Sequence, residues 1–202
     1  MKPLIVGLTG QTGAGKTTVS RCFRAAGLAV IDCDLVAREV VEVGSPCLEE
    51  IRAAFGPEML DENGALRRRE MARLVFGDPE KKRQYEAIIF PHITVALERE
   101  IARLENRAVA VLDAPTLFES GADSMCRCIV SVVAPEELRV KRIVERDGID
   151  RELALLRIRA QHEEAFFRGR SRFVIDNGGD LEALEQAARQ TAEELLALAR
   201  LF

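Results

Sequence analysis

The sequence lacks any apolar run approaching the roughly 18 residues that a membrane-spanning helix requires. It passes from Met1-Lys2-Pro3 directly into a short apolar segment, without a pattern typical of a secretory signal. It also lacks an excess of positive charge, since 29 Lys and Arg residues oppose 33 Asp and Glu residues and the net charge is −4. These absences argue against membrane and nucleic-acid partners, and we expect a cytoplasmic protein.

Cysteine spacing typical of a zinc site is absent as well. The five cysteines are scattered, and Cys126 and Cys128 are separated by a single residue, which does not match a zinc finger. We expect these thiols to be reduced and mostly structural. Internal repeats, low-complexity tracts and long linkers are also absent. The 202 residues, of which 48% are hydrophobic, are therefore consistent with one domain plus insertions.

What the sequence does contain is a phosphate-binding motif near its start. The apolar run LIVGL at residues 4–8 has the length of a buried strand. The motif GQTGAGKT at residues 10–17 follows it and matches the phosphate-binding loop at every fixed position. Residues 16–26 then have a helical pattern. The alternative is a glycine turn with a surface lysine, but the order of strand, loop and helix favours nucleotide binding.

Each fixed position of this motif has a chemical reason. The glycines let the backbone turn tightly and point successive N–H groups at a polyphosphate. Lys16 supplies a positive charge for the outer phosphates, and the hydroxyl of Thr17 is placed to hold Mg²⁺. The helix that follows directs its N-terminal dipole at the same phosphates. The motif therefore predicts a site for a nucleotide polyphosphate with Mg²⁺.

Carboxylates follow two further predicted strands. Residues 28–31 form one strand and lead into Asp32 and Asp34, and residues 108–112 form another and lead into Asp113. Ligands of open α/β sheets gather at the carboxyl ends of strands, so these positions suit a metal ion or a substrate hydroxyl. Asp113 either binds Mg²⁺ through water or caps the next helix. Asp34 likewise either binds a metal ion or a substrate hydroxyl, or caps the next helix. For Asp34, the nearby phosphate loop favours the functional interpretation.

The middle of the chain, residues 44–106, is predicted to be a helical insertion without a strand. Glycine and proline breaks separate its helical patterns, and Pro91 is expected to start a new helix. Insertions of this kind often hold a second substrate. The basic run at residues 67–69 is interpreted as a solvated helix face, with contact to an acidic substrate as the alternative. The predicted helices span residues 46–55, 67–76, 79–90 and 92–105.

Residues 136–170 are dense in charge and fit two helices joined at Asp147-Gly148. Interleaved acidic residues favour a solvated helical pair. A phosphoryl-transfer enzyme, however, needs mobile cations that neutralise charge and exclude water. Both interpretations stay open for Arg142 and Arg146, which are candidates to face the nucleotide.

Strands alternate with helices along most of the chain. The remaining predicted strands span residues 129–133 and 173–176, and an amphipathic helix over residues 181–201 follows. The connections are long enough for right-handed crossovers. The sequence therefore predicts an α/β fold with a five-stranded parallel sheet, helices on both faces, one helical insertion and an Arg-rich helical lid.

Several longer segments resemble the dephospho-CoA kinase family, over essentially the whole chain. They are VGLTGQTGAGKTTV, VIDCDLVAREVV, LDAPTLFESG, RIVERDGIDRELALLRIRAQ and FVIDNGGDLEAL. The phosphate loop is shared by many kinases, whereas D-x-D followed by V-A-R, and D-x-P-x-L-F-E, are more particular to this family. The resemblance implies a P-loop NTPase fold like that of adenylate kinase. It also implies transfer of the ATP γ-phosphoryl to the ribose 3′-hydroxyl of dephospho-CoA, giving coenzyme A and ADP, the last step of CoA biosynthesis.

The resemblance implies roles for individual residues. Asp34 would contact and deprotonate the 3′-hydroxyl, and Asp32 would orient it or hold Mg²⁺ through water. Arg38 would lie by the acceptor's phosphate, Arg142 would reach the nucleotide phosphates, and Asn177 would lie near adenine. The implied catalytic residues are Asp34, Lys16, Asp32 and Arg142. The implied nucleotide-binding residues are Thr12, Gly13, Ala14, Gly15, Lys16, Thr17, Thr18, Arg142 and Asn177. The implied substrate-binding residues are Asp34, Arg38 and Asp113.

The resemblance also implies how the chain divides its work. ATP would be the co-substrate, and Mg²⁺ would be held by Thr17, with Asp32 or Asp113 acting through water. We expect a monomer or a weak homo-oligomer. The implied parts are a nucleotide-binding core of residues 1–33, 107–134 and 171–202, a helical CoA-binding insertion of residues 34–106, and a lid of residues 135–170.

The chain departs from the family pattern at several positions. A histidine usually precedes the proline of the middle helical segment, whereas here His92 follows Pro91. A glutamine of the first lid helix is replaced by Arg139, and a lysine common in the later lid aligns near Phe167. Cys33 occupies the middle of D-x-D, where a small residue such as Ala is usual. The phosphate loop and both D-x-D carboxylates keep the pattern.

Two other functions fit parts of the sequence. Another small-molecule kinase, such as a nucleoside or nucleotide kinase, would share the phosphate loop, but the D-x-D segment and the insertion favour dephospho-CoA. The second is a nucleotide-dependent switch or binding protein with slow hydrolysis, of which a guanine-specific switch would need an N-K-x-D segment. The nearest match, NGGD at residues 177–180, lacks the lysine. The Arg-rich lid also favours a water-excluding kinase over a switch.

Overall fold

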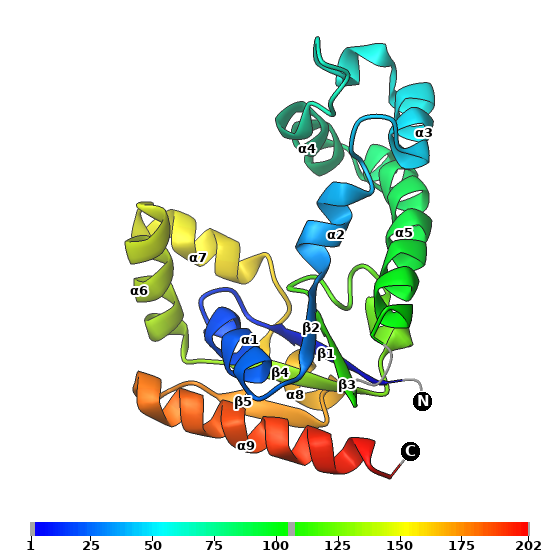
Figure 1. Ribbon diagram of the computed structural model, residues 1–202. Coiled ribbons are helices and arrows are strands. Elements are labelled where there is room, and N and C mark those ends of the chain that lie inside the picture. The colour runs from blue at the N-terminus through cyan, green and yellow to red at the C-terminus, as the bar shows by residue number, and fades with distance from the viewer. Residues whose placement is uncertain (1–2, 105–107, 202) are drawn as a thin grey trace. The chain divides into compact units, whose positions relative to one another are not determined.

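The computed structural model describes residues 3–104 and 108–201, which form two compact units. We name them the sheet unit, described residues 3–31, 104 and 108–201, and the helical unit, residues 32–103. Figure 1 labels the elements of each. Residues 105–107 lie outside the described residues. They include the predicted end of the last insertion helix at residue 105 and the predicted boundary between the insertion and the nucleotide-binding core at residues 106 and 107. The two ends of the predicted core, residues 1–2 and 202, also lie outside the described residues.

A five-stranded parallel sheet forms the centre of the sheet unit, in the order β2-β3-β1-β4-β5. The strands are β1 (Leu4–Gly10), β2 (Ala29–Asp32), β3 (Val109–Asp113), β4 (Cys128–Val133) and β5 (Phe173–Asp176). All residues of β3 are buried, as expected for a parallel sheet covered on both faces. The predicted fold class is confirmed, and each strand lies within two residues of its predicted bounds.

Alternate residues of each strand face opposite sides of the sheet, and helices pack on both sides. Val109 and Val111 belong to an apolar cluster with α1 (Lys16–Ala25) and α9 (Leu181–Ala199). Gly7 lies between two members of this cluster along β1 and faces the other way, where a Cβ would lie 2.4 Å from Leu117 Cδ2. The helix α8 (Glu164–Arg170) packs against β4 and buries Phe167. The phosphate loop is thus attached to a well-packed frame.

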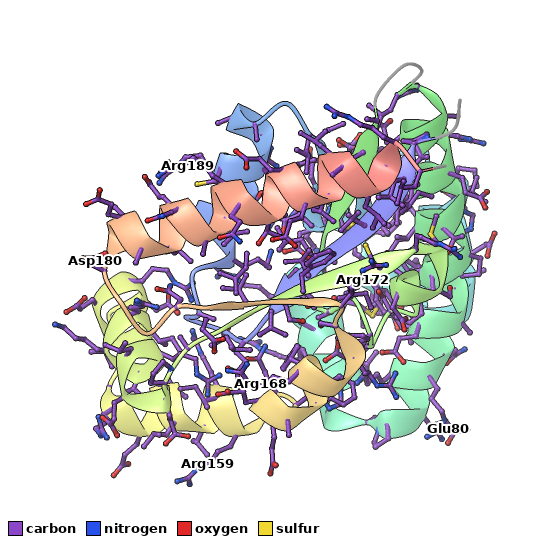
Figure 2. All side chains as sticks on the ribbon, turned by 90° about the horizontal axis from the view of Figure 1, so that it is seen from below. Glu80, Arg159, Arg168, Arg172, Asp180 and Arg189 are labelled. Carbon is purple, nitrogen blue, oxygen red and sulfur yellow. The ribbon has the colours of Figure 1, made fainter. Side chains whose placement is uncertain are left out.

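Three helices, rather than the predicted two, occupy the charged segment between β4 and β5. They are α6 (Glu136–Asp147), α7 (Arg151–Arg159) and α8. Gly148, with a φ angle of 64°, ends α6 where a break was predicted. The second break, at residues 160–163, has no glycine or proline to mark it. Figure 2 shows Arg168 on α8, where it pairs with Glu164 at 2.7 Å and with Asp176 at the end of β5.

The helical unit buries its own apolar cluster, in which Leu48 and Ile51 are almost fully buried. Side chains fix the starts of its helices. The Ser45 hydroxyl accepts a hydrogen bond from the Leu48 N–H at 3.2 Å, and the Asp78 carboxylate accepts one from the Glu80 N–H at 2.8 Å. The elements are α2 (Cys33–Glu39), α3 (Pro46–Phe55), the short 3₁₀ turn η1 (Pro57–Met59), α4 (Arg68–Gly77) and α5 (Pro79–Ala102).

The long helix α5 runs through Pro91, so the prediction that Pro91 starts a new helix is wrong. Proline removes one backbone donor from a helix, but apolar packing on both sides of it stabilises a continuous helix here. Ile89 and Leu97 are both buried. His92 makes a surface contact, with its Nε2 atom 3.1 Å from Glu50 Oε1. Among the described residues, we find no helix long and apolar enough to cross a membrane.

Candidate active site

The phosphate-binding motif forms the turn between β1 and α1. Gly13 and Gly15 have φ angles of 76° and 100°, and Gly15 takes the N-cap position of α1. A Cβ on Gly13 would lie 2.9 Å from the backbone oxygen of Arg139, and one on Gly15 would lie 2.5 Å from Asn177 Nδ2. Both the backbone conformation and the close approach of neighbours therefore require glycine at these positions.

The backbone N–H groups of this loop divide into occupied and open ones. Three of them are occupied. The Gln11 N–H donates to Val132 O at 3.2 Å, and the Ala14 N–H donates to Gln11 O at 3.0 Å. The Thr12 N–H donates to Gln161 Oε1 at 2.7 Å. Within residues 3–104 and 108–201, the open groups without an acceptor include those of Gly13, Gly15, Lys16 and Thr17. Open N–H groups at the start of a helix form an anion-binding nest. The loop is ready to bind a polyphosphate.

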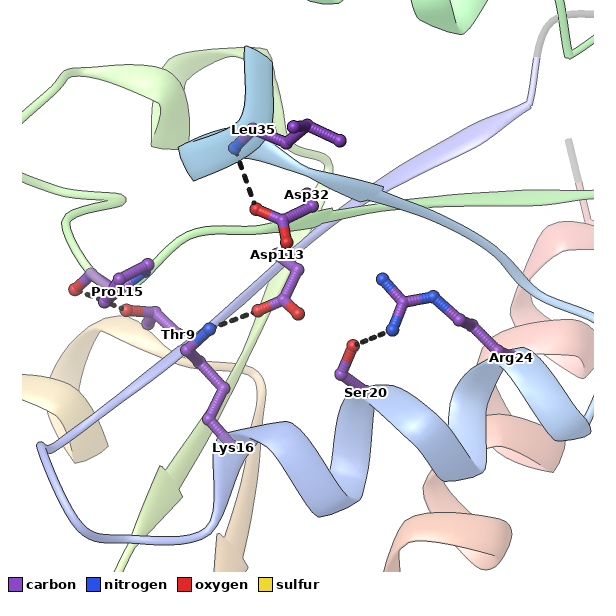
Figure 3. Close-up of polar contacts among 8 residues, drawn as sticks. All are labelled: Thr9, Lys16, Ser20, Arg24, Asp32, Leu35, Asp113 and Pro115. Atoms are coloured by element: carbon purple, nitrogen blue, oxygen red, sulfur yellow. Dashed lines mark hydrogen bonds and ion pairs between the residues drawn. The ribbon is translucent and has the colours of Figure 1, made fainter. Parts of the chain in front are cut away.

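Lys16 and Asp113 form an ion pair beside this nest, as Figure 3 shows. Lys16 begins α1, and Asp113 is the last residue of β3, the neighbour of β1 in the sheet. Their side chains are 20% and 10% exposed. The alternative role of Asp113 as a helix cap is wrong, because the described residues after it form turns until the 3₁₀ turn η2 (Ala122–Met125). The pair brings a cation and a carboxylate to the phosphate loop.

The two threonines that follow Lys16 lie in the first turn of α1. Thr17 is exposed and Thr18 is half-buried. In the part of the chain that the structure describes, neither hydroxyl takes part in a hydrogen bond. An exposed hydroxyl beside an anion-binding nest fits Mg²⁺, which keeps several waters and shares its few protein ligands with substrate phosphates. Thr17 is thus available as the predicted metal ligand.

Asn177 and Arg142 brace the loop from the end of β5 and from α6. Asn177 is buried and donates from Nδ2 to Ala14 O at 2.8 Å, and its Oδ1 accepts from Arg142 Nη2 at 3.4 Å. Arg142 Nη1 also donates to Gly13 O at 3.3 Å. Both side chains therefore contact the phosphate loop, while direct contact with phosphates or adenine stays a prediction. Arg146 instead is exposed and bonds twice to Asp147, at 2.7 Å and 3.0 Å.

The remaining predicted catalytic residues lie in the helical unit. Asp32, rather than Asp34, caps α2, because the Asp32 carboxylate accepts a hydrogen bond from the Leu35 N–H at 3.0 Å (Figure 3). The alternative role of Asp34 as the cap is therefore wrong. Asp34 is exposed in the first turn of α2, and Arg38 follows one turn later. The i, i+4 spacing puts Asp34 and Arg38 on one face of the helix.

A cavity of about 250 Å³ opens in the helical unit. Its walls are mostly apolar, and Phe76 among them is 84% exposed. Arg68 of the basic run is exposed, lines this cavity and donates to the Arg38 carbonyl at 3.0 Å. The lining residues include Leu66, Arg68, Met71, Val75, Phe76 and Tyr85.

Two polar side chains at the loop were not predicted from the sequence as site residues. Gln161 accepts the Thr12 N–H across 149 positions of sequence. Arg139 is 4% exposed, with no hydrogen-bond partner for Nε and Nη1 among the described residues, and burial lowers the pKa of its guanidinium. No spacing rule links such distant positions to the loop. The only signal was that Gln161 ends one of the segments typical of the family.

Replacing Gly15 with Ala should destabilise the chain and weaken nucleotide binding. The left-handed backbone would cost roughly 1–2 kcal/mol with a Cβ, and the overlap with Asn177 about 1–3 kcal/mol more. Urea unfolding measures the loss. Gly27→Ala is the matched control, because Gly27 has a φ angle of 87° but nothing within 4 Å of an added Cβ. Equal losses in both variants would contradict the close approach of Asn177.

An open phosphate loop between the first strand and helix of a five-stranded parallel sheet, with its lysine in place, is the nucleotide site of a P-loop NTPase. A family model described as dephospho-CoA kinase matches residues 4–183. The chain belongs to the dephospho-CoA kinase family, and ATP is the co-substrate of these kinases.

Individual relatives and solved structures agree with this assignment. The chain is 44% identical to the dephospho-CoA kinase of Corynebacterium diphtheriae over 188 residues, which cover 92% of this chain and 94% of the relative. The dephospho-CoA kinase structure from Campylobacter jejuni has a TM-score of 0.70 at 25% identity and covers 96% of this chain and 97% of its own. A shikimate kinase from Bacteroides thetaiotaomicron, with a TM-score of 0.53 at 19% identity and coverage of 95% and 98%, shares the fold alone.

Proposed function

We propose that this chain transfers the γ-phosphoryl group of ATP to the ribose 3′-hydroxyl of dephospho-CoA and releases coenzyme A and ADP, the last step of CoA biosynthesis. One observation carries the proposal. In a chain of this family, open N–H groups line the phosphate loop beside the Lys16–Asp113 ion pair. This arrangement can orient a polyphosphate and neutralise its charge. Orientation and charge neutralisation are most of what a protein contributes to phosphoryl transfer.

The proposal divides the work between the parts of the chain. The nucleotide-binding core comprises residues 1–33, 107–134 and 171–202, the CoA-binding insertion residues 34–106, and the lid residues 135–170. The bond from Arg142 to Gly13 O supports the lid assignment, because it links this segment to the phosphate loop. The mostly apolar cavity with one arginine supports the insertion as the binding part for an acceptor with a long organic arm and phosphates.

In the proposed reaction, the acceptor oxygen forms a bond to the γ-phosphorus while the bond to the β-γ bridging oxygen breaks. The hydroxyl proton passes to the Asp34 carboxylate, and Asp32 orients the hydroxyl. Arg38 lies by the acceptor's phosphate, on the same face of α2 as Asp34. Lys16 and Arg142 stabilise charge on the transferred group. The transition state is loose, so the proton leaves late and an ordinary carboxylate suffices.

We further propose that Mg²⁺ enters with ATP and is held by the Thr17 hydroxyl, with Asp113 or Asp32 acting through water. When bound, it neutralises charge on the β- and γ-phosphates. Thr18 and Asn177 complete the nucleotide site, Asn177 on the side of adenine. The proposal also includes a cytoplasmic monomer or weak homo-oligomer without membrane or nucleic-acid partners. The net charge of −4 supports the absence of a nucleic-acid partner.

ADP release measured with Mg·ATP, with and without dephospho-CoA, tests the proposal. We expect strong stimulation by dephospho-CoA, little with adenosine or AMP, and a product that carries the new phosphate at the ribose 3′ position. Stimulation by adenosine or AMP alone would indicate a nucleoside or nucleotide kinase. Nucleotide binding without acceptor-dependent turnover would indicate a switch and would overturn the kinase function.

A further inference from the structure

The phosphate loop makes one side-chain contact that none of the assigned roles explains. The Thr12 N–H donates to Gln161 Oε1 at 2.7 Å, in a partly buried position. Thr12 directly precedes Gly13, where the series of open N–H groups begins. The orientation of the Thr12 peptide therefore bears directly on where the next N–H group points.

The chemistry of this contact fixes the orientation of the Gln161 side chain. A backbone N–H only donates, so the atom that faces it must be the amide oxygen of Gln161 rather than its nitrogen. The bond uses an N–H group outside the anion-binding nest, because the N–H groups of Gly13, Gly15, Lys16 and Thr17 stay open in the described chain. Gln161 therefore does not compete with a polyphosphate for the loop.

The backbone around Gln161 is held on both sides. Its own N–H donates to Ile158 O at 3.2 Å at the end of α7, and Ile158 packs in the buried cluster between α6 and α7. The next residue, His162, stacks on Phe166 of α8 with ring centroids 3.7 Å apart and an interplanar angle of 14°. Because this turn is held on both sides, the Gln161 side chain loses little further conformational entropy when its amide oxygen accepts the hydrogen bond.

We propose that Gln161 is a positioning residue that holds the Thr12 peptide so that the open N–H groups of the loop converge on the shared α- and β-phosphates of ATP and ADP. It acts through the loop and does not touch the nucleotide. The inference rests on the proposed nucleotide site. It adds a residue from the turn between α7 and α8 to the parts that shape this site.

The test compares Gln161→Met with Gln190→Met in the full chain. Methionine has a similar length but lacks a strong acceptor, so Gln161→Met removes the bond with little change in shape. Gln190 is an exposed glutamine on α9 that bonds to Glu194 at 3.3 Å, and it controls for the same chemical change on the surface. Two readouts are needed: affinity for ADP and for ATP by titration calorimetry, and hydrogen exchange of the assigned Thr12 amide.

We expect Gln161→Met to weaken ADP and ATP by the same factor, about three- to tenfold, because a single neutral hydrogen bond is lost and both nucleotides share the affected phosphates. Exchange of the Thr12 amide should accelerate by about tenfold or more, while the melting temperature stays close to that of Gln190→Met. The phosphoryl-transfer assay should show the loss mainly as a higher KM for ATP, with a smaller change in kcat.

The alternatives give different results. Unchanged affinity for both nucleotides with wild-type melting behaviour would overturn the positioning role, and so would weaker ATP with unchanged ADP, which would place Gln161 at the γ-phosphate. A lower melting temperature with unchanged affinity would make Gln161 a purely structural residue and overturn it too. Failure of the wild-type chain to bind ADP would instead overturn the nucleotide site itself, so the two failures are distinguishable.

Discussion

Replacing Lys16 with Met should lower kcat/KM for phosphoryl transfer by about 10²–10³-fold, the effect of removing one preorganised donor from developing charge. Lys16 begins α1, and its ammonium is held beside the open N–H groups of the loop by Asp113. Methionine keeps most of the length of the side chain and removes its charge. Steady-state kinetics with Mg·ATP and dephospho-CoA measure the loss.

This substitution also leaves Asp113 without its partner, so folding must be measured separately from catalysis. The Asp113 side chain is only 10% exposed, and removing one member of a largely buried ion pair destabilises a protein on the order of 3 kcal/mol. Lys16→Met/Asp113→Asn removes both charges. It should recover much of the free energy of unfolding in urea and none of the activity. Wild-type turnover in the double variant would show that Lys16 is not the phosphate cation.

The parts of this site that could be predicted are those whose determinants lie close together in the sequence. The loop at residues 10–17 carries its glycines, lysine and threonine in one run, so spacing alone predicted its conformation. The strands were predictable because buried parallel strands are short apolar runs. The position of Asp113 at the edge of the sheet that carries the loop followed from the rule that strand ends gather there, whereas its ion pair with Lys16 was not predicted.

The parts that could not be predicted depend on contacts between distant segments. Pro91 is a helix breaker in isolation, yet α5 continues through it, with Ile89 and Leu97 buried on either side. The break between α7 and α8 has no glycine or proline, and it coincides with the turn from which Gln161 reaches the phosphate loop. Asn177, expected near adenine, also has its amide oxygen and nitrogen engaged by Arg142 and Ala14. Local patterns carry no information on such partners.

Replacing Asp34 with Asn should lower kcat by about 10²–10⁴-fold, the range for loss of a positioned general base, and nearer the lower limit because the proton leaves late in a loose transition state. Asp34 is exposed in the first turn of α2, where Asn has the same shape and can still hydrogen-bond. The KM for ATP should stay near its wild-type value, because the proposed nucleotide site lies in the sheet unit. Single-turnover kinetics with saturating substrates measure the chemical step directly.

Two further variants show whether this loss belongs to the position of Asp34 or to charge in general. Glu39→Gln removes one exposed carboxylate from the same helix and should leave kcat unchanged. Asp32→Asn keeps an effective N-cap, since Asn caps helices as well as Asp does. It should reduce kcat by about tenfold or less, because Asn keeps an oxygen that can orient the hydroxyl and only the difference between a charged and a neutral hydrogen bond is lost. Near-wild-type kcat in Asp34→Asn, with a normal KM for dephospho-CoA, would remove the general base from the mechanism. Catalysis would then have to arise from alignment and charge neutralisation at the phosphate loop alone.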